Sequence, residues 1–183
     1  MTDQPRLPPD QPFPWIRVTS RPSARSLGWL TAPDWRIPVA LGRSGIIANK
    51  FEGDGGTPRG VFHPVRLWWR RDRHARPRTL LPIVPITPLD AWCENPADRR
   101  YNRPIRLTGT ASGDRLMRDD PLYDFIVEID HNMRPRTANR GSAVFFHLAR
   151  PRFAPTAGCV AMTGPAMLRL LARLGPETKI VIE

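Results

Sequence analysis

The sequence Phe145-Phe146-His147-Leu148 is followed by an Arg/Pro-rich loop and then by Thr156-Ala157-Gly158-Cys159-Val160. The first segment is an apolar run of the kind found in buried strands, and the second places a cysteine directly behind a glycine. A fold that brings these two segments together brings a thiol to an imidazole. A free thiol has a pKa of about 8.5, so an imidazole that accepts its proton activates it at neutral pH and leaves an ion pair. The pattern indicates a cysteine nucleophile, Cys159, with His147 as its base; a buried structural cysteine is the alternative.

The residues next to Cys159 suit this chemistry. A glycine at position 158 allows the backbone to approach a substrate closely, and the amides of Gly158 and Cys159 are candidates to hold an oxyanion. The hydroxyl of Thr156 is placed to support the turn. A helix is expected after the cysteine, beginning near Thr163 and Pro165 and stopping at Gly175-Pro176. Its apolar stripe, expected to pack in the core, is Met167, Leu168, Leu171 and Leu174. The helix dipole is expected to lower the thiol pKa.

The segment from His147 to Met162 resembles the motif of the YkuD-type L,D-transpeptidases, in which a histidine precedes Ser/Thr-His-Gly-Cys and an aliphatic residue. Upstream, Gly56-Thr57-Pro58-Arg59-Gly60-Val61-Phe62 is similar to the Thr-Pro-x-Gly-x-Phe element of the same family. A divergent subgroup also has a Trp-Cys-x-x-Pro-x-x-x-x-Tyr-Asn segment, matched here from Trp92 to Asn102. The chain departs from the family motif at Ala157, where a histidine is usual, and at Ala161, where a polar Arg or Asn is usual.

The resemblance implies a peptidoglycan L,D-transpeptidase, a cysteine acyltransferase that needs no cofactor. Cys159 would attack a tetrapeptide stem at the bond between diaminopimelate and D-Ala, and a second stem would resolve the thioester into a 3-3 cross-link. Carbapenems would acylate the same cysteine. The partners implied are donor and acceptor stem peptides, and the location implied is the periplasm, although no apolar segment of a secretory signal is visible in the sequence.

Substrate-binding residues are less directly indicated. Arg150 or Arg152 is a candidate to bind a stem carboxylate in place of the missing polar residue at Ala161, with a solvated loop charge as the alternative. Trp92, Tyr101 and Asn102 are candidates to line the substrate groove.

Two other functions remain open from the sequence. Water in place of the amine would give an L,D-carboxypeptidase or endopeptidase of the same fold. A non-catalytic module that binds peptidoglycan or another polyanion is suggested by the net charge of +11 and by the arginines that surround Trp68 and Trp69 between Arg66 and Arg78. This run contains no recognised nucleic-acid motif. The histidines and the two cysteines, Cys93 and Cys159, lack the paired spacing of zinc ligands, and a disulfide between the cysteines is not favoured.

The composition predicts one mainly β (α+β) domain, which the resemblance specifies as a YkuD-like sandwich or barrel with a helix after the cysteine. A length of 183 residues suits a single catalytic domain over 15–183, preceded by a flexible polar arm over 1–14. Residues 90–103 are expected to form an irregular loop that covers a site. Strands are expected from alternating apolar residues at 15–19, 36–41, 45–49, 60–69, 105–107, 124–129, 143–148 and 179–183.

Overall fold

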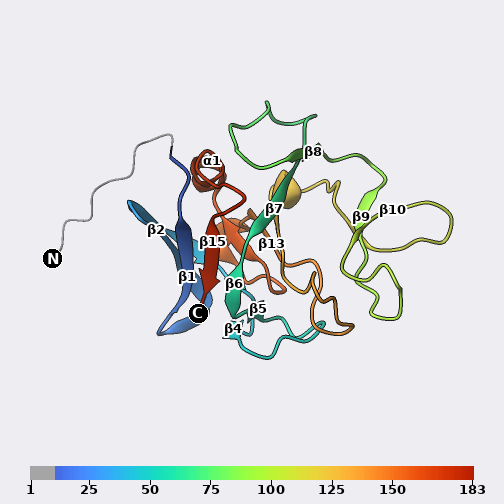
Figure 1. The fold of residues 1–183 in the computed structure, drawn as a ribbon, viewed down its shortest axis with the longest axis horizontal. Helices are drawn as coiled ribbons and strands as arrows, with labels where there is room; N and C mark the ends of the chain where they lie inside the picture. The colour runs from blue at the N-terminus through green and yellow to red at the C-terminus, as the bar shows by residue number, and fades with distance from the viewer. Residues whose placement is uncertain (1–10) are drawn as a thin grey trace.

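A computed structural model describes residues 11–183 and shows a mainly β chain in which a curled, half-barrel sheet is accompanied by one α-helix (Figure 1). The mainly β expectation is therefore confirmed. The strands of this part of the chain are β1 Trp15–Arg21, β2 Ala24–Ala32, β3 Trp35–Ala40, β4 Ile46–Ile47, β5 Thr57–Pro58, β6 Gly60–Phe62, β7 Pro64–Trp69, β8 Ile83–Pro85, β9 Asp90–Trp92, β10 Pro104–Arg106, β11 Asp114–Arg115, β12 Phe125–Ile129, β13 Phe145–Leu148, β14 Val160–Met162 and β15 Lys179–Ile182. The helix α1 spans Gly164–Leu171, and 3₁₀ turns occupy η1 Pro121–Tyr123 and η2 Pro151–Phe153.

The main sheet has ten strands in the order β6-β15-β1-β2-β3-β14-β13-β12-β7-β8. Most neighbours are antiparallel, but β13 and β14 pair in parallel, as do β1 and β15. A parallel pair needs a crossover connection, and between β13 and β14 this is the Arg/Pro-rich loop that contains η2. The segments 145–148 and 156–160 are therefore neighbours in the main sheet.

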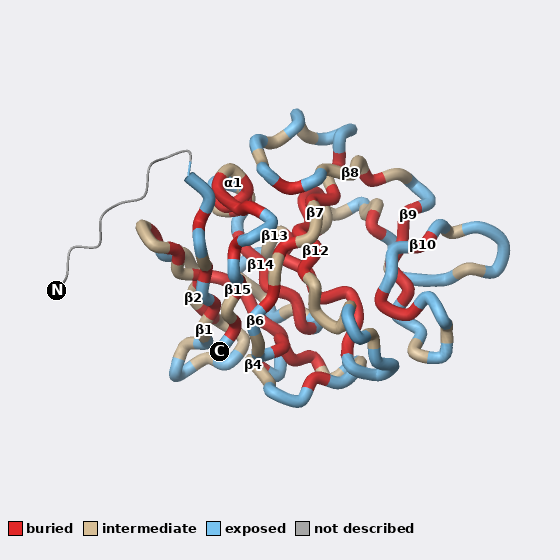
Figure 2. Tube along the Cα trace, viewed as in Figure 1, coloured by how far each residue is buried: buried red, intermediate tan, exposed pale blue. Residues whose placement is uncertain are grey.

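The strands β12 and β13 are buried on both faces because a second layer covers them (Figure 2). Alternate residues face opposite sides of a strand. Phe146 belongs to the main core inside the curled sheet, whereas its neighbour Phe145 packs with Trp68, Trp92 and Cys159 on the outer side. The nucleophile candidate therefore lies between the main sheet and the second layer.

That second layer is built around a small sheet in the order β10-β9-β11. Its central strand, β9, begins the segment that was expected to be an irregular loop over 90–103, so that expectation is wrong at its start. Beyond Trp92 the segment consists of turns, and Glu94 in it lines the cavity described below. Through Glu94 this segment reaches the cavity, as expected for a segment that covers a site.

The helix after the cysteine is confirmed, with Thr163 at its N-cap and Pro165 in its first turn. The Thr163 side chain makes no capping hydrogen bond, and α1 ends at Leu171, before the expected stop. Leu168, which was expected in the apolar stripe, is exposed, and the buried residues are Met167, Leu170, Leu171 and, beyond the helix, Leu174. These side chains pack against the inner face of the main sheet and complete the main core.

The segment assigned to a flexible arm differs from that assignment where it can be described. Residues 1–10 lie outside the described residues. Phe13 is only 1% exposed, its N–H donates to the Arg173 carbonyl at 2.8 Å, and its carbonyl accepts from the Thr178 hydroxyl at 2.7 Å. Residues 11–14 are thus part of the packed domain.

The predicted strands match β1, β3, β4, β10, β12, β13 and β15, with small differences at their ends. The expected strand 60–69 is split at His63, where the chain stops pairing with β15 and starts pairing with β12. The long strand β2 was missed because Gly28 interrupts its apolar alternation. A Cβ on Gly28 would lie 2.5 Å from the Thr19 carbonyl oxygen, so the glycine allows β1 and β2 to approach. The part of the chain that the structure describes contains no helix with the length and hydropathy of a membrane span.

Candidate active site

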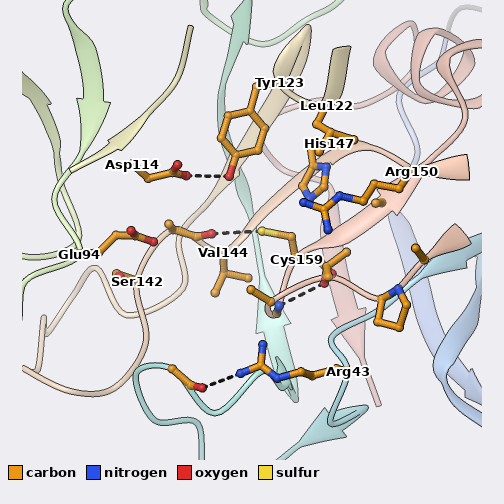
Figure 3. Close-up of a pocket in the computed structure, with 18 of the residues that line it drawn as sticks. Arg43, Glu94, Asp114, Leu122, Tyr123, Ser142, Val144, His147, Arg150 and Cys159 are labelled. Carbon is orange, nitrogen blue, oxygen red and sulfur yellow. Dashed lines mark hydrogen bonds between the residues drawn. The ribbon is translucent and has the colours of Figure 1, made fainter. Parts of the chain in front are cut away.

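The parallel register of β13 and β14 places His147 and Cys159 on the same face. Phe146 pairs with Val160 and His147 pairs with Ala161, so the residue before Val160 is turned to the side on which His147 and Ala161 lie. All three line one cavity of about 680 Å³, and Figure 3 shows the imidazole and the thiol reaching into it. The pairing of thiol and imidazole that the sequence predicted is thus geometrically available.

The Cys159 thiol is held by two backbone groups. Its Sγ donates to the Ala143 carbonyl at 3.1 Å and accepts from the Phe145 N–H at 3.3 Å. The side chain is 8% exposed, and this burial raises the pKa of the thiol to about 12, against the opposing effect of the Phe145 amide. The expectation of a lowered thiol pKa is therefore wrong, because burial raises it and β14 separates Cys159 from the N-terminus of α1.

The His147 ring is buried and oriented by the backbone. Its Nδ1 lies 2.8 Å from the Leu148 carbonyl oxygen, so the tautomer with a proton on Nδ1 donates there and leaves Nε2 as the acceptor. The ring is also in edge contact with Tyr123, at a centroid distance of 5.5 Å. Burial lowers the pKa of His147 to about 4. Together with the raised thiol pKa, this favours a neutral resting pair over the ion pair that the sequence suggested.

Thr156 and Gly158 shape the turn in front of Cys159. The Thr156 hydroxyl donates to the Cys159 carbonyl at 2.7 Å and accepts from the Gly158 N–H at 3.1 Å, as the sequence predicted for a supporting hydroxyl. Gly158 has φ of 147°, and a Cβ there would lie 2.8 Å from the Gly56 carbonyl oxygen. Only glycine suits this position. The Gly56–Phe62 motif and the cysteine motif therefore meet in space.

Of the residues that the sequence suggested for substrate binding, the structure places only some at the cavity. Arg150 lines the cavity, but Arg152 does not. Trp92, Tyr101 and Asn102 are buried and lie outside the cavity wall, which corrects the expectation that they line a substrate groove.

These three residues instead support the site from behind. The Asn102 Oδ1 accepts from the Trp92 indole at 3.0 Å and from the Ala143 N–H at 3.2 Å. The Tyr101 hydroxyl donates to Glu52, which also accepts from Ser142 at 2.8 Å. Asn102 thereby holds the residue whose carbonyl accepts the thiol proton.

Several cavity residues were missed by the sequence analysis because they come from distant segments. Tyr123 lies beside His147 in Figure 3, and its hydroxyl donates to Asp114 at 2.7 Å. Glu94 lies on the same side as Asp114, and burial together with the charges of Asp114 and Glu52 raises its pKa to about 7. The missed lining residues with polar side chains are Arg43, Lys50, Glu52, Glu94, Asp114, Arg118, Tyr123 and Ser142. None of them is a defining position of a motif, since Glu94 occupies a variable position of the segment from Trp92 to Asn102.

The run of arginines from Arg66 to Arg78 is largely occupied within the protein. Arg70 is buried and bonds to Asp72 and to the Arg118 carbonyl. Arg66 pairs with Glu128 at 3.1 Å, and Arg73 pairs with Asp124 at 2.9 Å. Trp68 is buried. These contacts weaken the interpretation of this run as a polyanion-binding patch.

Both cysteines are free thiols, and Cys93 is buried in a separate cluster from Cys159.

Comparison with curated proteins and with solved structures gave no significant match. Residues 18–182 match the family model for YkuD, described as the L,D-transpeptidase catalytic domain. Because this match covers nearly the whole chain and includes both the Gly56–Phe62 motif and the cysteine motif, the protein belongs to the YkuD family of L,D-transpeptidase catalytic domains.

Proposed function

We propose that this domain is a peptidoglycan L,D-transpeptidase that uses Cys159 as its nucleophile and His147 as its base. The observation that supports this most directly is the β13/β14 register, which turns both side chains into one cavity. The Leu148 carbonyl supports the role of His147, because it selects the tautomer whose Nε2 accepts a proton.

In the first half-reaction, Cys159 attacks the carbonyl at the L-centre of diaminopimelate in a donor stem. The thiol proton passes to His147 Nε2 as the carbon–sulfur bond forms. When the bond to D-Ala breaks, His147 returns this proton to the leaving amine. In the second half-reaction, an acceptor amine attacks the thioester, its proton passes to His147, and the Cys159 thiol is regenerated as the 3-3 cross-link forms.

The neutral resting pair determines when the nucleophile forms. The buried thiol has a pKa of about 12 and the imidazole a pKa of about 4, so proton transfer is unfavourable before substrate is bound. Transfer then accompanies attack, since the charge moves on to the oxygen of the substrate carbonyl. A hydrogen-bond donor is needed at that oxygen. The Gly158 N–H is engaged by Thr156, which makes the Cys159 amide the proposed donor.

The charged residues of the cavity suit a stem peptide, whose diaminopimelate has both carboxylate and amine groups. Arg150 is the proposed partner of a stem carboxylate, since it lines the cavity where Arg152 does not. Because the substrate is peptidoglycan, we propose the periplasm as the location of this activity.

The test is mass spectrometry of purified disaccharide-tetrapeptide incubated with the wild-type chain and with Cys159→Ala. A dimer joined through two diaminopimelates, absent with the variant, is the expected result. A tripeptide without a dimer would assign hydrolysis instead. Unchanged substrate, together with failure of a carbapenem to add its mass to Cys159, would refute the enzymatic proposal.

A further inference from the structure

Lys50 is a buried cation in the wall of the cavity that the proposed mechanism does not use. Its side chain is 7% exposed, and it lines the same cavity as Cys159. Lysine is almost never buried to this degree without a partner. The position and partner of this charge therefore need an explanation.

The partner of Lys50 is Asp54, and only the lysine of this pair lines the cavity. The Lys50 Nζ lies 2.5 Å from Asp54 Oδ1 and donates to the Phe51 carbonyl at 2.8 Å. Asp54 also accepts from the amides of Phe51 at 2.6 Å and Gly56 at 2.8 Å. Lys50 lines the cavity and Asp54 does not. Lys50 is therefore the member of the pair that belongs to the cavity wall, and Asp54 binds its ammonium outside that wall.

The stem of Lys50 lies against the turn that precedes the nucleophile. A Cβ on Gly158 would lie 3.7 Å from the Lys50 Cε, and a Cβ on Gly141 would lie 2.8 Å from the Lys50 Cγ. Gly141 leaves room for the lysine stem, and the distance at Gly158 is that of an ordinary van der Waals contact. The lysine stem is therefore packed beside the Gly158 turn and the segment that leads to Ala143.

We propose that Lys50 is a positioning residue whose fixed positive charge stabilises the thiolate of Cys159 and the anion formed on the attacked carbonyl. The inference rests on Cys159 being the nucleophile of the proposed function. It gives a role to a cation from outside the cysteine motif, in a chain that has alanines at the two polar positions of that motif, Ala157 and Ala161.

The charges around the thiol explain why such a cation matters. Burial raises the pKa of Cys159, the carboxylates of Asp114 and Glu94 raise it further, and Lys50 opposes them. The other charged or titratable side chains of this cavity are Arg43, Glu52, Arg118, Tyr123, His147 and Arg150, and behind Lys50 stand Asp54 and His131.

The test measures the rate at which iodoacetamide alkylates Cys159 between pH 6 and pH 10, in a Cys93→Ala background so that one thiol reacts. Lys50→Met keeps an apolar stem and removes the charge. We expect alkylation to slow about tenfold at pH 7, because loss of the charge would leave about a tenfold smaller fraction of the thiol ionised. Lys50→Arg keeps the charge and is expected to retain most of the rate.

Asp54→Asn provides the matched control. It removes the negative charge behind Lys50, so we expect the thiol to react faster than in the wild type, whereas a purely structural role of the pair predicts slower or unchanged reaction. A wild-type pH profile in Lys50→Met, or no acceleration in Asp54→Asn, would overturn the inference. If Lys50→Met does not fold, Asp54→Asn decides alone. Alkylation needs no stem peptide, so its result is independent of whether transpeptidation is observed.

Discussion

The buried imidazole of His147 should make the protein less stable as the pH falls from 7 to 5. Its pKa is about 4 in the folded protein, against an ordinary value of about 6.5 in the unfolded chain. The unfolded state therefore binds more protons in this range, so the stability present above pH 6.5 is lost as the pH falls toward 4. Integration of this difference gives a loss of about 2 kcal/mol at pH 5 and about 3 kcal/mol at pH 4.

Urea unfolding of the wild type and of His147→Asn at pH 7.5 and pH 5 isolates this contribution. The asparagine amide can still donate to the Leu148 carbonyl in place of Nδ1. Glu94 and Asp114, whose pKa values are raised, act in the opposite direction, and His131, whose pKa is lowered, acts in the same direction. All three are present in both proteins and cancel in the comparison. The stability of the wild type relative to the variant should fall by about 2 kcal/mol between the two pH values.

The sign of the change separates two resting states. If His147 formed an ion pair with the Cys159 thiolate, its folded pKa would be raised, and the wild type would gain stability relative to the variant at acid pH. A relative gain would thus disprove the neutral pair. Parallel stabilities at both pH values would show that the imidazole is solvated, and would equally contradict the burial argument.

Three further substitutions test the turn and the core. Thr156→Val removes a hydroxyl with two hydrogen bonds and should cost about 1–3 kcal/mol in urea unfolding and slow carbapenem acylation, whereas Thr156→Ser should retain both properties. Gly158→Ala forces a side chain against the Gly56 carbonyl at a positive φ and should cost about 1–3 kcal/mol of unfolding free energy. The acylation rate should fall by more than this loss of stability when the rate ratio is converted to free energy. Phe13→Ala should cost about 3–5 kcal/mol, because Phe13 is a core residue; a loss below 1 kcal/mol would place it in a loose arm instead.

The sequence was sufficient to predict those elements and site residues that depend on neighbours close together in the chain. The strand ending at Leu148 was recognisable from a short apolar run, and Cys159 from the glycine and threonine of its own turn. The helix after the cysteine was recognisable from Pro165 and the leucine spacing. In each case local backbone preference and final packing favour the same structure.

The rest of the site depends on long-range pairing that no local pattern specifies. Lys50 reaches the cavity because its loop packs against Gly158, and Asp114 reaches it on the edge strand of the small sheet. Arg150 and Arg152 are chemically equivalent in the sequence, but only Arg150 lines the cavity. Arg152 adopts a left-handed backbone with φ of 57°, inside a 3₁₀ turn that the sequence does not indicate.

The segment from Trp92 to Asn102 supports the cavity wall although Trp92, Tyr101 and Asn102 do not line the cavity. The Asn102 amide donates to the carbonyls of His131 and Asn132 at 3.0 Å each, while its oxygen accepts from Trp92 and Ala143. All four partners are fixed at once, because a buried amide left unpaired costs free energy. Ala143 has φ of 51°, a conformation that an alanine rarely adopts and that must be held by its surroundings. Since the Ala143 carbonyl accepts the thiol proton, the buried amide of Asn102 helps to fix the position of the Cys159 thiol.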